Sequence, residues 1–582
     1  MFKHLSSFIK AHRKHTILGL VILVVIDALQ LVTPTLLGNL ADGLASKSIT
    51  QTQIYGYMFW IFGIAVLVAI GRYWWRILIN GTSRKAEYWI RNKIFAHLET
   101  LTWQYFSQHK VGDIMALATN DVTAVGAAMG MGLVMLVDAV FMSILTIILM
   151  FVNIDPQLTL IAVLPMPFIA LLVGFGGKLL RKRFKSVQEV FSHMTDQVQE
   201  SFSGVRIIKT YTREDHHRHL FQKTNQENLD ENMKLVRLWG MMFPLVKTIA
   251  SISLIITLLY GGFMVIDQKI TVGMFIAFIS YIGMLTWPMM AIGWVVNVIE
   301  RGVASLKRIN EFLDIEPEFT YGEADLEKTE DPNTPVIALK GLSFTYPDTE
   351  RPVLKNVDMR VMRGQKVGII GRTGSGKSTL VNLMTKAWAV ENGKIFIEGQ
   401  EINQLSKTAI KTHFGFVPQD NFLFSRNIED NIRFFEQDMT LEAVEASAKI
   451  ANVHSEILDF SQGYDTLLGE RGVNLSGGQK QRIGIARALL KRSEIIVLDD
   501  ALSAVDTKTE ESILRHLKEA LKDRTAIIIA HRISAIKDCD WIYVLDDGEM
   551  VEQGTHETLC GGSGLYRHIY DRQQLEEKIA EE

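Results

Sequence analysis

The sequence predicts a chain of two parts, a membrane domain of six helices followed by a mixed α/β domain. Apolar runs long enough to cross a bilayer, which takes about 20 helical residues, all lie before residue 299. Strand-like runs such as 366–370 and 495–498 occur only beyond it. The composition agrees, because 48% hydrophobic and 21% charged residues are too apolar for a soluble protein and too charged for one wholly in lipid.

The overall charge and the cysteine content exclude several classes of protein. The chain of 582 residues carries 61 Lys+Arg and 64 Asp+Glu, a net charge of −3, so it has no signature of nucleic-acid binding and no nucleic-acid partner is expected. Its two cysteines, Cys539 and Cys560, give no basis for a disulfide framework or a cysteine zinc site.

Six apolar runs are the candidate membrane spans, and they lie at about 16–38, 54–79, 130–153, 157–179, 243–266 and 272–298. The first run follows Lys3, Lys10, Arg13 and Lys14 and lacks an A-x-A cleavage site, so it is predicted to be a span and not a removable signal peptide. The N-terminus is therefore expected to be cytoplasmic.

The charges of the connecting loops support this orientation, because Lys and Arg accumulate on the cytoplasmic side. Segment 80–129 carries five Lys or Arg residues and segment 180–242 carries eleven. The alternate loops at 39–53, 154–156 and 267–271 carry one, none and one. Six spans with both chain ends in the cytoplasm fit every loop.

The two cytoplasmic connections are too long to be structureless and are predicted to be helical. In 184–210, apolar residues recur at steps of three and four, which predicts one amphipathic helix that continues the fourth span into the cytoplasm. Polar stretches at 108–113 and 211–215 are expected at the ends of these projections. By themselves they are equally compatible with simple turns between helices.

A phosphate-binding loop follows the strand-like segment 366–370. The pattern G-x-x-x-x-G-K-[ST] is met, in its strand–loop–helix context, by Gly371, Arg372, Thr373, Gly374, Ser375, Gly376, Lys377 and Ser378, with Thr379 next in the helix. Backbone N–H groups and the helix N-terminus are expected to hold phosphate oxygens, Lys377 to reach the β- and γ-phosphates, and Ser378 to bind Mg²⁺.

Two further strands end in residues suited to the same site. The apolar strand 495–498 runs into Asp499 and Asp500; we expect Asp499 to hold Mg²⁺ and Asp500 to lie next to the attacking water. The strand 525–530 presents His531 at its end. Taken alone, His531 is also compatible with an ordinary surface histidine.

The segment 475–482, Leu-Ser-Gly-Gly-Gln-Lys-Gln-Arg, resembles the signature of ATP-binding cassette (ABC) proteins. Other motifs occur in that family's order: Tyr346 is similar to the aromatic that stacks on adenine, Gln419 to the Q-loop glutamine, and 503–506 to the D-loop that ends in Asp506. His531 is similar to the switch histidine. With the six spans and the stretch 200–209, the resemblance is to an ABC exporter over nearly the whole chain.

This resemblance implies a six-helix transmembrane domain of the ABC exporter type, followed by an α/β P-loop nucleotide-binding domain. The expected boundaries are 1–310 for the membrane domain, 311–336 for a linker, 337–575 for the cassette and 576–582 for a tail. It also implies a multi-pass protein of the cell (inner) membrane with a cytoplasmic cassette, and it makes the polar stretches at 108–113 and 211–218 similar to coupling helices.

The family's chemistry implies ATP and Mg²⁺ as ligands. Mg²⁺ is expected on Ser378, Gln419 and Asp499, and the catalytic roles fall to Asp500, His531 and Gln419. In this family a nucleotide lies between the phosphate loop of one cassette and the signature of another. The residues expected to act on the opposite nucleotide are Ser476, Gly477, Gly478, Gln479 and Asp506. One chain has a single set of motifs, so a second half-transporter is implied.

The sequence departs from the family at one position, because the usual Asp-Glu pair is here Asp499-Asp500. An aspartate retracts the carboxylate by about 1.5 Å, and a misplacement of about 1 Å can cost about 10²-fold in rate. Slow hydrolysis with retained ATP binding is expected. Since the signature is intact, the chain resembles the degenerate-site subunit of a heterodimeric multidrug exporter, whose different partner supplies the catalytic Glu. A homodimer that tolerates Asp500 is the alternative, and the retained His531 is compatible with it.

The spans carry aromatic and methionine side chains that suit amphipathic, drug-like molecules, although packing on lipid or neighbouring helices is the better explanation for any single one. These residues include Trp60, Phe141, Met142, Met150, Phe275, Phe278, Met284, Trp287 and Met289. Asp27, an ionisable group inside a span, is expected to line a cavity or to bond to Gln30 or a partner helix. Three functions remain open: a drug exporter conferring antibiotic resistance, an exporter or flippase of lipid or peptide, and a non-transporting sensor.

Overall fold

The computed structural model describes residues 3–347, 349–434, 438–469, 472–505, 507–522 and 524–581. The chain forms two compact units. The first consists of Met1–Thr100 with His109–Ile315, and the second of Leu101–Gln108 with Glu316–Glu582.

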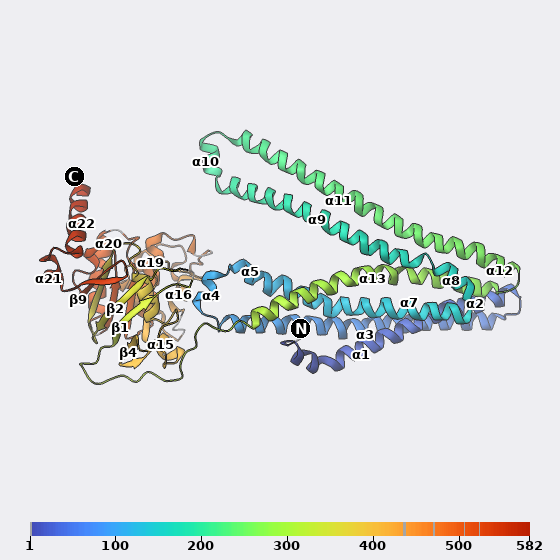
Figure 1. Ribbon diagram of the computed structural model, residues 1–582, viewed down its shortest axis with the longest axis horizontal. Helices are drawn as coiled ribbons and strands as arrows, with labels where there is room; N and C mark the ends of the chain where they lie inside the picture. The colour runs from blue at the N-terminus through green and yellow to red at the C-terminus, as the bar shows by residue number, and fades with distance from the viewer. Residues whose placement is uncertain are drawn as a thin grey trace. The chain divides into compact units, whose positions relative to one another are not determined.

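The first unit is entirely helical in its described residues (Figure 1). Its helices are α1 (Ser6–Gln30), α2 (Val32–Ala45), α3 (Gln51–Leu98), α5 (Val111–Ala116), α6 (Val122–Ala127), α7 (Leu133–Asn153), α8 (Pro156–Val163), α9 (Met166–Ser203), α10 (Val205–Thr210), α11 (Glu214–Ile256), α12 (Gly262–Ile266) and α13 (Val272–Leu313). Short π-helical turns at Leu117–Asp121, Ala128–Gly132 and Thr257–Gly261 join some of them into longer rods.

Six helical segments of this unit are long and apolar enough to cross a membrane, as the sequence predicts. They are Ser6–Ala45, Gln51–Leu98, Val111–Asn153, Pro156–Ser203, Glu214–Ile266 and Val272–Leu313. Each has at least 40 residues, or about 60 Å of helix at 1.5 Å per residue, against a hydrocarbon core of about 30 Å. The segments therefore extend well beyond the bilayer.

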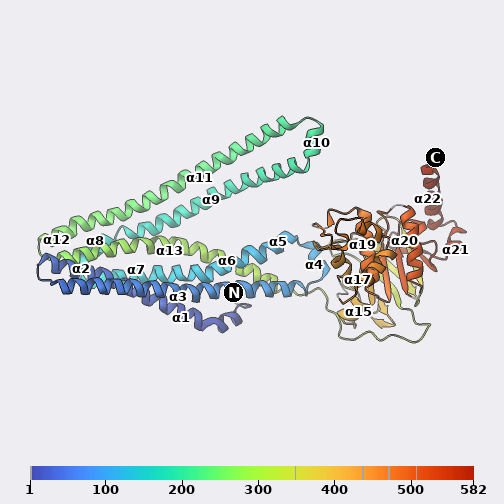
Figure 2. The ribbon, with the colours of Figure 1, turned by 180° about the vertical axis from the view of Figure 1, so that it is seen from behind.

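The helical hairpin of α9 and α11 is the most projecting part of this unit (Figures 1 and 2). A single helix was expected over 184–210, but the structure ends α9 at Ser203 and begins α10 after Gly204. Gly204 has φ −90° and ψ 10°, outside helical geometry, so the chain turns there. The short α10 consequently lies across the tip of the hairpin (Figure 1).

Two glycines allow α2 and α13 to pack closely. A side chain at Gly273 would overlap the carbonyl oxygen of Gly38, so only glycine fits this crossing. Next to it, the Asp42 carboxylate accepts hydrogen bonds from the Thr271 hydroxyl and the Gly273 N–H, both at 2.6 Å. Asp42 thereby satisfies the N–H group of Gly273, which lies at the start of α13 and has no partner within the helix.

Asp27 lies buried inside the first unit. Its residue is 3% exposed, and it interacts with Asp138 of α7 and with Arg72 of α3. The partners are therefore on neighbouring helices of the same chain, and the expected role in lining a cavity is not supported.

The second unit is an α/β domain with two sheets. Its strands are β1 (Ile337–Phe344), β2 (Leu354–Val361), β3 (Lys366–Gly371), β4 (Ile395–Ile397), β5 (Gln400–Glu401), β6 (Phe414–Val417), β7 (Ile495–Asp499), β8 (Thr525–Ile529), β9 (Trp541–Asp546) and β10 (Glu549–Gly554). Its helices are α4 (Trp103–Gln108), α14 (Lys377–Met384), α15 (Lys407–His413), α16 (Ile428–Arg433), α17 (Leu441–Ile450), α18 (His454–Leu458), α19 (Gly477–Leu490), α20 (Thr507–Ala520), α21 (His556–Cys560) and α22 (Leu565–Glu581).

The larger sheet has the order β10-β9-β3-β8-β7-β6 and is parallel except at β10. All five residues of β7 are buried, which explains the unbroken apolar run 495–498. The smaller, antiparallel sheet has the order β2-β1-β4-β5.

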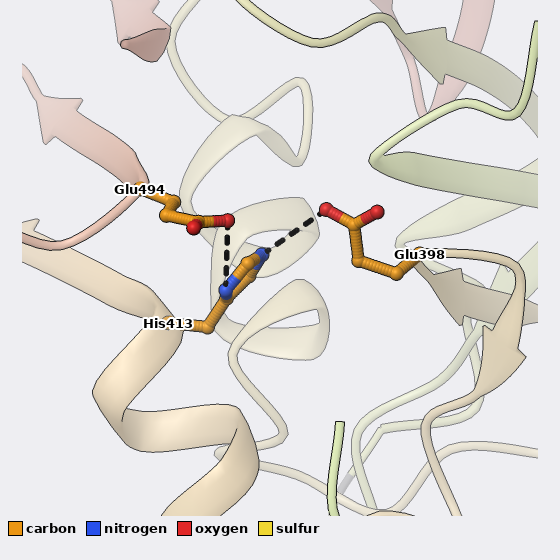
Figure 3. Close-up of side chains that lie close together, drawn as sticks. All are labelled: Glu398, His413 and Glu494. Atoms are coloured by element: carbon orange, nitrogen blue, oxygen red, sulfur yellow. Dashed lines mark ion pairs between the residues drawn. The ribbon is translucent and has the colours of Figure 1, made fainter. Parts of the chain in front are cut away.

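Within the second unit, a cluster of charged residues around the buried His413 holds the segment that follows α13. Figure 3 shows His413 between Glu398 and Glu494, with ring nitrogens 3.8 Å and 3.6 Å from their carboxylate oxygens. Arg363 donates to both oxygens of Glu398, at 2.8 Å and 2.7 Å, and Lys328 pairs with Glu494. Because two cations already neutralise the two carboxylates, the arrangement is an ion-pair network and is poorly suited to a metal ion.

We expect this cluster to make the second unit less stable in mild acid. Burial lowers the pKa of the His413 imidazole below its ordinary value of 6.5, Glu494 opposes that shift, and Lys328 and Arg363 add to it. The unfolded chain therefore binds the proton more tightly, and stability falls as the pH drops below about 6.5, by at most about 1.4 kcal/mol per pH unit. Thermal unfolding of the full chain at pH 7.5 and 6.0 measures this loss.

The variant His413→Gln removes the titrating group and should flatten this dependence. The exposed His568 provides a matched control, and His568→Gln should keep the wild-type slope. Equal slopes in all three proteins would contradict the assignment to His413.

Candidate nucleotide-binding site

Four neighbouring parallel strands of the larger sheet, in the order β3, β8, β7 and β6, direct their carboxyl ends to one edge. The predicted site residues follow these ends: the phosphate loop after β3, His531 after β8, Asp500 after β7 and Gln419 after β6. The structure brings them together around a pocket of about 280 Å³. Its lining consists of Val353, Thr373, Gly374, Gly376, Lys377, Ser378, Thr379, Gln419, Asp499, Asp500, Ile529 and His531.

The phosphate loop takes a conformation that requires glycine. Gly374 has φ +82° and Gly376 has φ +101°, where residues with a side chain are strained. A side chain at Gly371 would overlap the carbonyl oxygen of Leu545 on β9. The hydroxyl oxygen of Ser375 is buried and has no hydrogen-bond partner among the described residues. The loop therefore forms a concave turn with a hydroxyl group available to a ligand, as a phosphate-binding site requires.

Lys377 and Ser378 form the first turn of α14 beside the carboxylate of Asp499. The Lys377 ammonium group donates to the carbonyl oxygens of Gly371 at 2.9 Å and Arg372 at 2.8 Å. Burial lowers the pKa of Lys377, while the carboxylates of Asp499 and Asp500 oppose that shift. The side chain of Arg372 points elsewhere and pairs with Asp546 at 3.8 Å.

The donor set next to the loop fits Mg²⁺. The hydroxyl of Ser378 lies 3.2 Å from an Asp499 carboxylate oxygen, and Gln419 lines the same pocket. Burial raises the pKa of Asp499, and Asp500 adds to this, while Ser378, Lys377 and His531 oppose it. Such a group of oxygen ligands favours a hard cation such as Mg²⁺. The cation would offset the free-energy cost of burying the charged carboxylate of Asp499.

Asp500 is held in an unusual backbone conformation. Its φ is +49°, and its N–H donates to the carbonyl oxygen of Ile529 at 3.0 Å. Aspartate tolerates the left-handed region better than most residues with a side chain. The side chains of Asp500 and His531 both line the pocket, which is the placement expected for residues that act on a water at the phosphate.

Tyr346 lies beside this pocket and contacts its wall. Its hydroxyl is 2.9 Å from the hydroxyl of Thr379. Its ring is held edge-on by Phe344 and Trp388, each with ring centroids 5.0 Å away. A rigidly held aromatic next to the phosphate loop is compatible with the predicted stacking on adenine.

The signature residues form the start of α19 and do not line this pocket. Ser476 caps the helix by accepting from the N–H of Gln479 at 3.2 Å, and the Gln479 side chain accepts from the N–H of Ser476 at 2.9 Å. Gln479 and Arg482 are further held by Glu456, with Arg482 bonded at 2.6 Å and 2.9 Å. Ser476 and Gly477 are exposed, whereas Gly478 is buried. Asp506 of the predicted D-loop lies outside the described residues.

Gln481 is a residue of this site to which the sequence analysis gave no role. Its amide donates to the hydroxyl of Ser503 at 3.1 Å and to the carbonyl oxygen of Asp500 at 3.4 Å, and it accepts from the N–H of Ala504 at 3.0 Å. It therefore joins the signature helix to the segment that carries Asp500. A polar residue on the buried face of α19 was the available signal, since Gln481 is 7% exposed.

A membrane unit of six spans and an α/β unit with a phosphate loop define an ATP-driven membrane transporter. Residues 16–289 match the model of the ABC transporter transmembrane region, and residues 354–503 match the ABC transporter model. The chain belongs to the ABC transporter family, whose ATP-binding domain implies ATPase-coupled transport.

Several known proteins resemble the whole chain. It is 36% identical to the probable multidrug resistance ABC transporter ATP-binding/permease protein YheI of Bacillus subtilis, over 99% of this chain and 98% of that protein. It is 37% identical to the multidrug resistance-like ATP-binding protein MdlA of Escherichia coli, over 99% and 97%. An ATP-dependent lipid A-core flippase of Syntrophus aciditrophicus is 32% identical, over 88% and 84%.

A solved structure, that of a bacterial Atm1-family ABC exporter with ATP bound, matches with a TM-score of 0.76 at 25% identity, covering 96% of this chain and 98% of that one. The predicted fold class and the resemblance to ABC exporters are thus confirmed.

We expect the replacement of Gln481 to separate nucleotide binding from hydrolysis. Gln481→Ala removes three hydrogen bonds that position the segment after β7, but it touches no group of the phosphate loop. ATP affinity, measured with a fluorescent ATP analogue, should change less than twofold, whereas the ATPase rate of the assembled transporter should fall about tenfold.

Two further variants sharpen this experiment. Gln481→Glu keeps the acceptor for Ala504 but loses both donated bonds, so it should behave like Gln481→Ala. The exposed Gln462 serves as control, and Gln462→Ala should match the wild type. A parallel loss of affinity and rate in Gln481→Ala would indicate a general folding defect instead.

Proposed function

We propose that this chain is one subunit of a heterodimeric, ATP-driven multidrug efflux transporter, a BmrC-type subunit like that of the bacterial exporter BmrCD. In this proposal it binds ATP at its own degenerate site and contributes its signature to the competent site of a different partner. The observation that carries the proposal is the contrast between Asp500, a short carboxylate in an otherwise complete pocket, and an intact, well-capped signature.

In this proposal, each group of pocket residues has its own role in binding ATP at the chain's own site. The loop N–H groups and Lys377 bind the phosphates, and Tyr346 provides the stacking surface for adenine. Ser378, Asp499 and Gln419 would hold Mg²⁺, which supplies charge neutralisation on the phosphates when bound. Asp500 accepts a proton from water less well than a glutamate would, because its carboxylate is retracted by about 1.5 Å.

A second chain is supported by what this one leaves exposed. The capped N-terminus of α19, with Ser476 and Gly477, is turned to solvent and offers N–H groups to an anion. On the projecting part of α9, Phe184 is 59% exposed and Phe202 is 74% exposed. Large apolar side chains of this kind are normally covered by a partner.

The short helix α4 and the turn after α10 are suited to transmit closure of the cassettes to the spans. The helix α4 belongs to the second unit although it lies between two spans in sequence, and its neighbour Thr102 donates to Glu318. The turn at 211–213 joins α10 to α11 at the tip of the projecting hairpin (Figure 2). These positions support the proposal that the stretches near 108–113 and 211–218 act as coupling elements.

The proposed setting is the cell (inner) membrane, with the N-terminus and the cassette in the cytoplasm. Loop charges support this orientation, and the multidrug names of YheI and MdlA support amphipathic drug-like substrates and a role in antibiotic resistance. Membrane lipid is the immediate surrounding of the spans and a possible substrate.

A homodimeric exporter or flippase of a lipid or other amphipathic molecule is the second candidate. The similarity to ATP-dependent lipid A-core flippases of Syntrophus aciditrophicus and Vibrio vulnificus favours it. His531 is also retained at the pocket, as a hydrolysing site requires.

The decisive experiment compares the wild type with Asp500→Glu, each purified alone. We expect the wild type to bind ATP but to hydrolyse it at a rate near zero, and Asp500→Glu to gain tenfold or more, because the longer side chain restores the reach of the base. ATPase rate, ATP binding and oligomeric state are measured on the same preparations, and Asp500→Asn serves as an uncharged control.

A brisk wild-type ATPase in a stable homodimer would overturn the asymmetric assignment and favour the second candidate. If the heterodimer hydrolyses ATP in sealed vesicles without moving a drug or a lipid, the chain is a sensor and not a transporter.

A further inference from the structure

A cavity of about 780 Å³ in the membrane unit is lined by one face of α3 together with Gln30 and Thr33. We propose that this cavity binds amphiphiles with an anionic head group, with Arg72 and Arg76 holding the head and the apolar part of the face holding the tail. The proposal rests on the transport function above and names the class of substrate.

The lining residues of α3 follow one another at helical spacing. They are Ile61, Ile64, Ala65, Val68, Ala69, Arg72, Tyr73, Arg76 and Ile77, in alternating steps of three residues and one. The face is thus apolar over its first three turns and becomes cationic over the next. Such a sequence of surfaces matches a molecule with an apolar body and a charged end.

The two arginines indicate that this face is turned to water and not to lipid. An arginine exposed to the hydrocarbon costs at least about 2.5 kcal/mol, so ionisable groups in spans face protein or an aqueous cavity. Both Arg72 and Arg76 are exposed in the single chain and lie within the apolar run 54–79.

The charge accessible in this cavity is positive. The two acidic groups that interact with Arg72 are Asp27, which is 3% exposed, and Asp138, and neither is part of the lining. Arg72 interacts with Asp27 and Asp138, whereas Arg76 lies over the Trp75 ring at 5.5 Å and pairs with no carboxylate among the described residues. A ligand therefore meets two guanidinium groups, which recognise phosphate, sulfate or carboxylate through paired N–H donors. A cationic drug would meet repulsion at the same place.

The depth of Arg76 matches the head group of a lipid of the cytoplasmic leaflet. Counted from the middle of the run 54–79, Arg72 lies about 8 Å and Arg76 about 14 Å toward the side proposed to be cytoplasmic, at 1.5 Å per residue. The hydrocarbon half-thickness is about 15 Å. Ile61 to Ala69 then lie at the depth of the acyl chains, and Arg76 lies at the depth of the head group. Arg72 lies about 7 Å inside the hydrocarbon boundary, a distance that its long side chain can span toward the head group.

The proposal is tested on the co-expressed transporter in detergent with three fluorescent probes that carry the same acyl chains. One has an anionic phosphate head, one a zwitterionic phosphocholine head and one a cationic head. We expect the anionic probe to bind most tightly and Arg76→Gln to weaken its binding about tenfold, while the other two probes change less than twofold. Arg76→Lys should recover part of the loss.

The exposed Lys85, on the same helix but outside the cavity, provides the control, and Lys85→Gln should leave all three affinities unchanged. Inorganic phosphate alone should not displace the anionic probe, because the tail contributes to binding; displacement would indicate a site for free anions. Tightest binding of the cationic probe, or equal effects of Arg76→Gln and Lys85→Gln, would overturn the proposal.

Basal ATPase activity measured in the same samples separates this inference from the proposed function. An active ATPase with no preference for anions refutes the inference alone. An inactive ATPase with every probe refutes the transport function.

Discussion

The nucleotide site depends on the contact between Gly371 and the backbone of β9. Because no side chain fits between position 371 and the Leu545 carbonyl oxygen, β3 can end directly against its neighbour and the loop can turn inward at once. That turn sets the start of α14, and with it the distance of 3.2 Å between Ser378 and Asp499 on β7. A wider spacing between β3 and β9 would shift the phosphate loop away from the site residues that follow β6, β7 and β8.

Much of this arrangement could be predicted from the sequence. The spacing of Gly371 to Ser378 defines a local structure that depends on few distant contacts, and unbroken apolar runs have few alternatives to membrane helices or buried strands. Once the strands are parallel neighbours, the residues that follow them must meet at one edge. The fold class and the meeting of Asp499, His531 and Gln419 at the loop therefore followed from short-range patterns.

Other features could not be predicted because they depend on contacts far apart in the chain. Periodicity gave a continuous helix through 184–210, since a glycine within it costs only about 1 kcal/mol and carries no signal of a turn. Asp27 was expected to line a cavity or to bond to Gln30 or a partner helix, and only the structure identifies its partners as Asp138 and Arg72 on two other helices. Gln481 shares a motif with residues that face outward, and only the tertiary fold shows that its own side chain points inward to Ser503.

The charge cluster of Glu398, His413 and Glu494 has a mechanical consequence. Glu494 directly precedes β7 and pairs with Lys328 of the segment that comes from the membrane helices, while Asp499 ends the same strand five residues later. A β-strand is nearly inextensible along its length, so a displacement passed to Glu494 would reach Asp499 across about 16 Å of backbone. The segment that follows α13 is thereby linked, through one ion pair and one buried strand, to a residue of the phosphate pocket.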